Sequence, residues 1–364
     1  MTGYIVLESI LAVLVISINL LVCATVYLHK EARSLTSCLI ACLAVADLGV
    51  GALGIPFSVM LSLRRTLCFY TCLFMACFPL VTAQFSVLVM LVIAVNTHLK
   101  TRLPSRRCPH VSCLCFSLRR YQVLVNKRRL LAAVFLCWLA SVLAGFTPLM
   151  GWNRLRSFGE DQGNRSALIS LGPSERSIIG QHLPYGGFLS KVYVRYRKNQ
   201  TYAQTHASHL GPCSLEAVVN PEYLVYFHFL AGTLLPLAAA LVLYTDLFFC
   251  QVRGQLPSPR ETHAPCRPAK RRENRTARTL LLMLALFSLC SLPRHLTSAV
   301  RLFRPTCSPP SWLPPLTALL SHLNSLAGPL LYAARRREFG AAMLSVLGRG
   351  FSRGRPSNKV YPRV

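Results

Sequence analysis

The chain has 364 residues, of which 53% are hydrophobic and only 14% are charged. Soluble domains usually carry about 25% charged residues, so this composition argues against a soluble protein and favours a membrane protein. Lysine and arginine total 40 against 12 acidic residues, which gives a formal net charge of +28. These basic residues lie between apolar segments rather than along one face of a polar domain. That placement disfavours nucleic-acid binding and fits an anionic inner membrane leaflet.

The central apolar segment, residues 68–99, contains no lysine, arginine, aspartate or glutamate. As a helix it would be about 45 Å long, more than the ~30 Å hydrocarbon core of a bilayer. Similar segments before and after it predict an all-α membrane protein, a bundle of seven transmembrane helices within residues 1–334. Pro56 is expected to kink the second helix. The expected helices are residues 4–28, 36–63, 68–99, 130–150, 222–252, 279–303 and 312–334.

The sequence after the seventh segment predicts a short amphipathic helix over residues 335–348. Phe339, Met343 and Leu347 recur at helical spacing, which suits a helix on the membrane surface. The Gly-, Arg- and Pro-rich residues 349–364 are expected to form a disordered cytoplasmic tail.

The loops after the first, third and fifth segments and the tail hold most of the arginine, so we assign them to the cytoplasm. The protein is then a multi-pass membrane protein with an extracellular N-terminus. The long segment after the fourth helix contains two N-glycosylation triplets, at Asn164 and Asn199. No internal repeat of the transporter type is visible, which disfavours a transporter or channel.

Fifteen cysteines are present, but most are isolated in apolar runs, where a thiol behaves as a small hydrophobic group. Cys108, Cys113 and Cys115 have no His or Cys partner at zinc spacing, so we expect no metal centre of that kind. Paired carboxylates and a nucleophile–base set are also absent from any common face, so the chain is not expected to be an enzyme.

Several runs resemble the adenosine receptors, a branch of the rhodopsin-like G-protein-coupled receptors. They are residues 43–47 (LAVAD), 145–153 (GFTPLMGWN) and 320–325 (LSHLNS), with residues 69–75 and 244–248 most similar to the third subtype of that family. The resemblance covers all seven helices. It implies a plasma-membrane receptor that binds extracellular adenosine or a related purine nucleoside. An inhibitory heterotrimeric G protein is the implied signalling partner, and homo- or heterodimers are compatible with it.

The resemblance also implies a disulfide between Cys72 and Cys213, with Cys68 or Cys307 as alternative partners of Cys213, or a free thiol there. Asp47, Ser86 and Asn324 match the family's allosteric sodium pocket. The alternative for Asp47 is a protonated carboxyl that is hydrogen-bonded between helices. No other cofactor is implied.

Five residues match the ligand positions of the family. Glu216 corresponds to the acceptor of the purine amine, Ser321 and His322 to the ribose end, Glu8 to the partner of that histidine, and His295 to a helix-six histidine. Two alternatives stay open, in which Glu216 is a solvated loop charge and His295 is a packing residue.

Other positions depart from the family. Leu215 stands where a phenylalanine stacks on the purine, and it offers no ring face. Ser298 replaces an asparagine that donates one hydrogen bond to adenine and accepts another at the same time. Ala83 replaces a threonine, and Pro79 interrupts the third helix. Adenosine recognition in the usual manner is therefore not expected.

The residues of the activation switch are altered as well. Asn96-Thr97-His98 replaces Asp-Arg-Tyr, Ser291 replaces the tryptophan ahead of Pro293, and Gly328 replaces the asparagine before Pro329 and Tyr332. We therefore expect weak or absent ligand-driven activation of a G protein. The alternative function is a non-signalling receptor-like protein, such as a decoy or a heteromer partner. Residues 107–119 and the long 151–212 segment resemble insertions.

Overall fold

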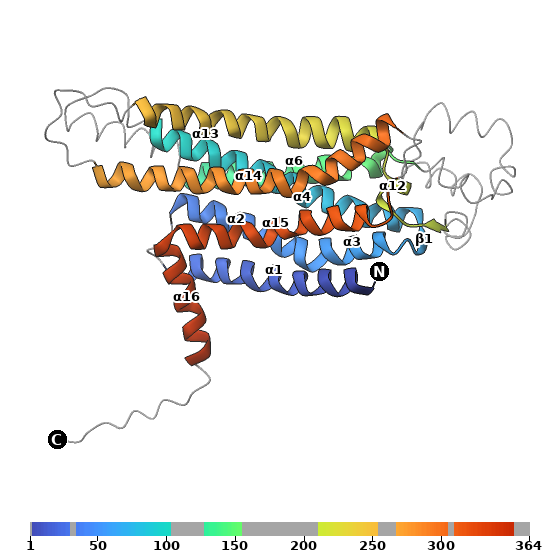
Figure 1. Ribbon diagram of the computed structural model, residues 1–364, viewed down its shortest axis with the longest axis horizontal. Helices are drawn as coiled ribbons and strands as arrows, with labels where there is room; N and C mark the ends of the chain where they lie inside the picture. Colours follow the sequence, from blue (N-terminus) through green and yellow to red (C-terminus); the bar gives the residue numbers. More distant parts are fainter. Residues whose placement is uncertain are drawn as a thin grey trace, which may run out of the picture.

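The computed structural model describes residues 2–29, 34–102, 127–154, 210–253, 267–304 and 309–352. Within these ranges the chain forms a bundle of long helices that lie side by side (Figure 1). Seven helical spans make up this bundle, so the expected all-α seven-helix fold is confirmed. The spans are α1 (Thr2–Leu28), α2–η2–α3 (Leu35–Gly49, Val50–Gly54, Ile55–Ser62), α4 (Phe69–Arg102), α6 (Lys127–Met150), η4–α13 (Tyr223–Leu234, Leu235–Arg253), α14 (Arg267–Phe303) and α15 (Leu313–Arg335).

Among the described residues, six of these spans are long and apolar enough to cross a membrane, and α15 is not one of them. Its histidine, asparagine and proline residues lower its apolar character, but it packs against α14 and α1 inside the bundle. Large apolar side chains on the outside are exposed, as at Val13, Leu235 and Leu289. Such a surface suits lipid rather than water.

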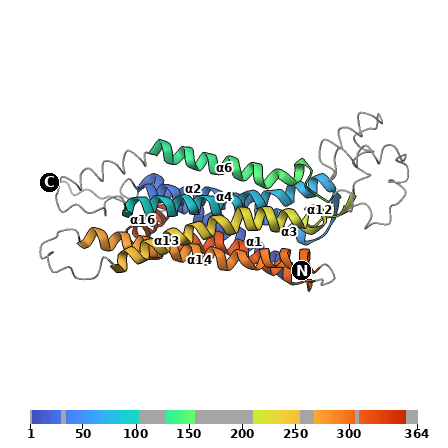
Figure 2. The same cartoon turned by 90° about the horizontal axis from the view of Figure 1, so that it is seen from above.

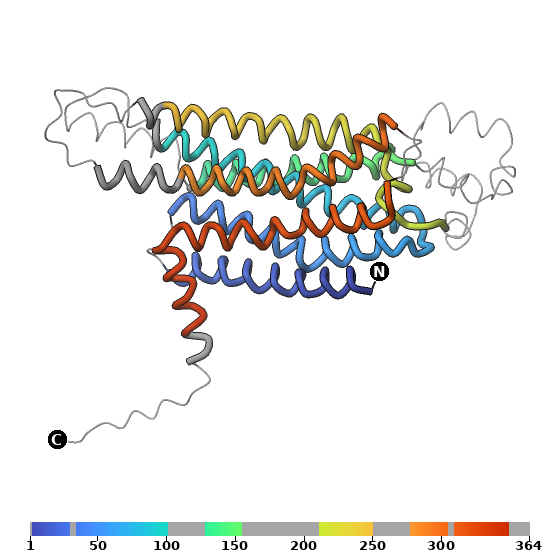
Figure 3. The backbone as a smooth tube through the Cα atoms, viewed as in Figure 1, coloured from blue at the N-terminus to red at the C-terminus, as the bar shows by residue number. Residues whose placement is uncertain are grey.

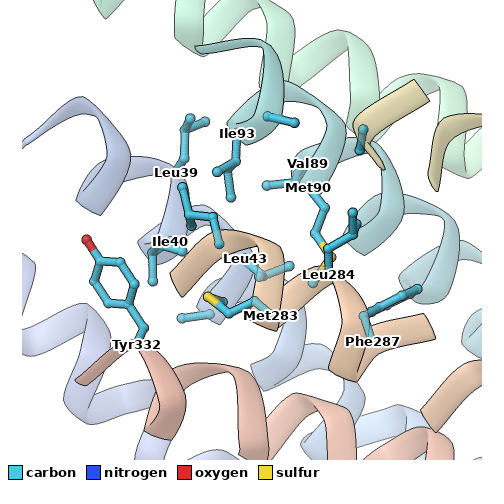
Figure 4. Close-up of a cluster of buried hydrophobic side chains, with 14 of the residues drawn as sticks. Leu39, Ile40, Leu43, Val89, Met90, Ile93, Met283, Leu284, Phe287 and Tyr332 are labelled. Carbon is cyan, nitrogen blue, oxygen red and sulfur yellow. The ribbon is translucent and has the colours of Figure 1, made fainter. Parts of the chain in front are cut away.

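The largest cluster of buried apolar side chains lies between α2, α4 and α14, and Figure 4 shows its centre. Tyr332 of α15 closes one side of it. Its ring packs edge-on against Phe339, with ring centroids 5.0 Å apart, and its hydroxyl lies 3.4 Å from Ser37 Oγ. The labelled members are Leu39, Ile40, Leu43, Val89, Met90, Ile93, Met283, Leu284, Phe287 and Tyr332.

Irregular turns interrupt two spans. In the second, the π-helical η2 lies directly before Pro56, where we expected a kink. A π-turn is one of the recognised causes of helix bending and often occurs at functional sites. In the fifth, the whole outer part, η4, is π-helical. A hydrophobicity pattern does not distinguish such turns from α-helix.

Two helices extend beyond their expected ends. The helix α14 begins at Arg267 rather than at residue 279, because residues 267–278 are rich in good helix formers although they are polar. The helix α16 (Arg337–Ser352) includes residues 349–352, which we had placed in a disordered tail. That expectation was wrong for these four positions, since two glycines alone do not end a helix. Asn164, Asn199 and residues 107–119 lie outside the described ranges.

The helix α16 turns away from the bundle axis after α15, as the tube in Figure 3 shows. Its apolar face is used partly within the protein, because Phe339 and Met343 are buried against the bundle while Leu344 is exposed. Contact of α16 with a membrane surface stays a prediction.

Candidate ligand-binding site

A disulfide and a small sheet organise the end of the bundle at which α4 begins. Cys72 and Cys213 are bonded, with Cα atoms 5.6 Å apart, whereas Cys68 is a free, buried thiol and Cys307 lies outside the described residues. Strand β1 (Thr66–Cys68) pairs antiparallel with β2 (Leu210–Pro212). The structure thus contains the pairing that the family resemblance implied.

These ties position the short helix α12 (Leu215–Val218). The Ser214 side chain caps it by accepting a hydrogen bond from the Ala217 amide. Leu215 and Glu216, which follow the cap, line a cavity of about 700 Å³ together with Arg294 and Ser298 of α14. We call this the outer cavity. Three of the expected ligand residues, Leu215, Glu216 and Ser298, therefore share one space.

The Glu216 carboxylate is ion-paired with Arg301, and its side chain is 32% exposed. Its Oε1 lies 3.0 Å from Nη1 of Arg301, and Nη1 of Arg154 donates to its backbone carbonyl at 3.0 Å. The Ser298 hydroxyl donates to the Arg294 carbonyl at 3.2 Å, so it is turned back onto its own helix.

A second, deeper space of about 70 Å³, the inner cavity, is lined by the remaining expected ligand residues except Glu8. Ligand pockets usually measure about 300–1,000 Å³, so the inner cavity is well below the usual size of a nucleoside site. The site predicted from sequence is thus divided between two spaces, and only Leu215, Arg294 and Ser298 among the residues discussed so far line both. The expected residues on the inner cavity are Ser86, Leu215, Ser291, His295, Ser298, Ser321, His322 and Asn324.

Glu8 and His322 form the expected pair between α1 and α15. The Nδ1 of His322 lies 3.1 Å and 3.0 Å from the two carboxylate oxygens, and both side chains are buried. Glu8 lines neither cavity among the described residues. The pair therefore joins two helices and orients His322, which does reach the inner cavity.

His295 packs and lines a cavity at the same time. Its ring stacks on Phe229, with centroids 4.6 Å apart, and lies 5.7 Å from the ring of His228. His228 in turn reaches the Leu80 carbonyl at 3.3 Å. The stack fixes His295 against the fifth span.

The residues expected to hold sodium are only partly brought together. Asp47 is buried on α2 beside Ser325, and the Ser86 hydroxyl donates to the Thr82 carbonyl at 3.0 Å. Ser86 and Asn324 face the inner cavity, but Asp47 is not among its lining residues. A carboxylate with hydroxyl and amide oxygens nearby is a donor set that suits a hard cation.

The inner end of α4 is tied to α13 at the altered switch residues. His98 Nε2 lies 2.8 Å from Asp246 Oδ2, and a hydrogen bond joins Thr97 to Tyr244. The Thr97 hydroxyl also donates to the Ile93 carbonyl at 2.7 Å, and Asn96 is buried. On the other helices, Ser291 lines the inner cavity, Pro293 lies inside α14 and Pro329 is buried in α15.

Sequence reasoning missed two features of this site, the partnership of His98 with Asp246 and the position of Arg294 at the junction of the cavities. A signal for Arg294 was present. An arginine within an apolar span is costly in a bilayer and marks a functional position by default.

Known proteins resemble the chain over nearly its whole length. The model of the 7 transmembrane receptor (rhodopsin family) matches residues 188–332. Adenosine receptor A2b of Gallus gallus is 32% identical over 345 residues, which cover 93% of this chain and 86% of the relative. Adenosine receptors A2a of Canis lupus familiaris and Homo sapiens are each 32% identical over 340 residues, 92% of this chain and 70% of each relative. With this extent of similarity added to the seven-helix bundle, the chain belongs to the adenosine receptor family of rhodopsin-like seven-transmembrane receptors.

Proposed function

We propose that the protein is a plasma-membrane receptor that binds a purine nucleoside-type ligand in the outer cavity. The observation that carries this proposal is the convergence of Leu215, Glu216 and Ser298 on one space of about 700 Å³. Ligand pockets usually measure about 300–1,000 Å³ and often lie between the helices of bundles. The family of the chain supports the nucleoside class.

The lining suggests that the purine ring is bound with lower affinity than in a site with an aromatic ring at position 215. Leu215, Leu61 and Leu224 supply apolar area, but none offers a π-face to stack on. The Glu216 carboxylate is the acceptor for an exocyclic amine, and it is already held by Arg301 at 3.0 Å. Affinity for neutral adenosine is therefore expected to be modest.

Radioligand binding to cell membranes tests this function. Labelled adenosine should bind saturably to the full-length protein, and Glu216→Ala should weaken binding about tenfold, the effect of losing about 1.4 kcal/mol. Glu222→Ala is the matched control, because Glu222 is exposed at the start of the fifth span and does not line the outer cavity. An absence of saturable binding, or equal losses in both variants, would contradict the proposal.

We propose further that ligand-driven coupling, through an inhibitory G protein, is weak. The similarity of residues 69–75 and 244–248 to the third subtype supports the inhibitory class. The weakness follows from Thr97, which bonds to its own helix where the family has an arginine, and from the tie between His98 and Asp246. A switch needs contacts that differ between two states.

Agonist-stimulated nucleotide exchange in membranes measures this coupling. We expect little stimulation of an inhibitory G protein above the basal rate, and robust stimulation would contradict the proposal. Stimulation of another G-protein class alone would overturn the assignment of class. A non-signalling decoy or heteromer partner is the second candidate, favoured by Thr97, Ser291 and Gly328 together. It would bind ligand at the cell surface and show no exchange with any class.

A further inference from the structure

The lining of the outer cavity is strongly cationic. Four arginines line it, Arg64, Arg154, Arg294 and Arg301, against one acidic side chain, Glu216. The Glu216 carboxylate is paired with Arg301, and neither Arg64 nor Arg294 forms an ion pair within the described residues. A neutral nucleoside would not change the net positive charge of the cavity.

Arg294 is the most unusual of the four. It lies within the membrane-spanning part of α14, is half-buried and lines both the outer and the inner cavity. The acidic side chains whose charges act on it are Glu216 and Glu8. Each of these is bonded elsewhere, to Arg301 at 3.0 Å and to His322 at 3.0 Å. Arg294 forms no ion pair within the part of the chain that the structure describes.

A cation inside a transmembrane segment is costly, and such arginines usually pair with an anion or serve a pathway or a ligand. Arg294 lines a cavity that is large enough for a ligand. An anionic group of a bound ligand could therefore pair with its guanidinium. A guanidinium donates two parallel hydrogen bonds to a phosphate group, which carries about −1.5 to −2 charges at neutral pH.

We propose that the outer cavity binds a phosphorylated purine nucleoside, with Arg294 as its phosphate contact. This inference rests on the proposed function and narrows its ligand class, from a neutral nucleoside to a nucleotide. Arg64 and Arg154 add to the positive potential that draws the anion in. A phosphate group would supply the anionic partner that Arg294 lacks within the described residues, and a neutral ligand would not.

The test compares four probes on the purified full-length protein in lipid nanodiscs, at one fixed ionic strength. The probes are adenosine, adenosine 5′-monophosphate, ribose 5-phosphate and inorganic phosphate. Adenosine 5′-monophosphate is expected to bind at least tenfold more tightly than adenosine. Arg294→Gln should weaken monophosphate binding ten- to a hundredfold and change adenosine binding far less, so that the ratio of the two affinities falls, whereas Arg294→Lys should keep part of that ratio.

Arg304→Gln is the matched control, since Arg304 directly follows α14 and does not line the outer cavity. It should leave the affinities for all four probes unchanged. If Arg294→Gln fails to fold, the comparison of the four probes on the unaltered protein and on Arg294→Lys still decides the matter.

Each remaining outcome overturns a different statement. Adenosine that binds as tightly as its monophosphate would overturn the nucleotide inference and leave the proposed function standing. Ribose 5-phosphate or inorganic phosphate that binds as tightly as the monophosphate would show an anion site without purine recognition. Failure of all four probes to bind would overturn the inference and the proposed function together.

Discussion

Glu8 and His322 meet inside the bundle, where Glu8 is fully buried and the His322 side chain is 6% exposed. The imidazole and the carboxyl group satisfy one another by hydrogen bonding in such a place, but their desolvation offsets much of the gain. Removal of one partner leaves the other buried and unmatched, which costs about 3–5 kcal/mol. Removal of both leaves no polar group to satisfy.

This asymmetry gives a prediction for the pair. Glu8→Leu and His322→Leu should each lower the melting temperature of the detergent-solubilised protein, and the double variant should melt at a higher temperature than either. The melting temperatures are measured by thermal unfolding, followed by the fluorescence of a thiol-reactive dye. Ser9→Ala is the control, because Ser9 bonds only the carbonyl of its own helix at Ile5. Additive losses in the double variant would show that the two side chains do not act as a pair.

Residues differ in how far the sequence alone could place them. The Glu8–His322 contact and the Cys72–Cys213 disulfide were expected because the chain resembles its family at those positions. Arg294 was not expected, because it is not among the residues that match the ligand positions of the family. Its place between two cavities depends on the rotation of α14, which a sequence does not give.

Helices α4 and α6 pack along each other (Figure 2), and Gly145 allows their close approach. A Cβ atom at Gly145 would lie 2.7 Å from the Val81 amide nitrogen and 2.9 Å from its Cα. Backbone atoms cannot turn aside as a flexible side chain can. Closely packed helices in membranes usually have small residues at their contact, because these let the two backbones approach each other.

Gly145→Ala should therefore destabilise the fold by about 1–3 kcal/mol, the usual cost of overpacking, despite the higher helix propensity of alanine. Gly49→Ala is the matched control, since its added Cβ would lie 3.9 Å from the Phe78 ring. Melting temperatures of the two variants in the same detergent decide the matter. Equal stability in the two variants would mean that α4 and α6 move apart at little cost.

The tie between His98 and Asp246 joins two helices at the altered switch. The two side chains are 22% and 42% exposed, and pairs so close to solvent contribute about 0–1 kcal/mol. Asp246→Asn should therefore change the melting temperature little. Amide hydrogen exchange should nevertheless become faster at the inner end of α13, residues 244–253, because a contact with α4 is lost there.

Glu222→Gln at the outer end of the same span is the control for that measurement, and it should leave exchange at residues 244–253 unchanged. Unaltered exchange in Asp246→Asn would show that the pair does not hold the inner end of α13. The remaining tie would then be the hydrogen bond between Thr97 and Tyr244.

The helices were predictable from the sequence where they lie in the lipid bilayer. Long uncharged runs must satisfy their backbone polar groups internally, so residues 68–99 allowed little besides a helix. The π-turns of η2 and η4 were not visible, because they depend on how neighbouring helices pack. The start of α14 at Arg267 was missed for the opposite reason, since polar helix formers carry no apolar signal.

The whole molecule places three features at one end of the bundle. The Cys72–Cys213 disulfide and the strands β1 and β2 lie there, and the N-terminus reaches the same end (Figure 1). A contact of 3.4 Å between the hydroxyls of Tyr4 and Ser62, just before β1, agrees with this arrangement. Disulfides form and persist in oxidising compartments, so we expect this end to lie outside the cell.

The disulfide therefore gives the same orientation as the basic loops, by an independent route. An epitope tag fused before Met1 should bind antibody on intact cells, whereas a tag after Val364 should bind only after permeabilisation, because seven spans leave the two termini on opposite sides. Flow cytometry with and without detergent measures both tags on the same cells. Cys72→Ser with the N-terminal tag serves as a second check, since orientation follows from charge and should survive loss of the bond. An N-terminal tag that needs permeabilisation at the plasma membrane would place the outer cavity in the cytosol, and no extracellular ligand could then reach Arg294.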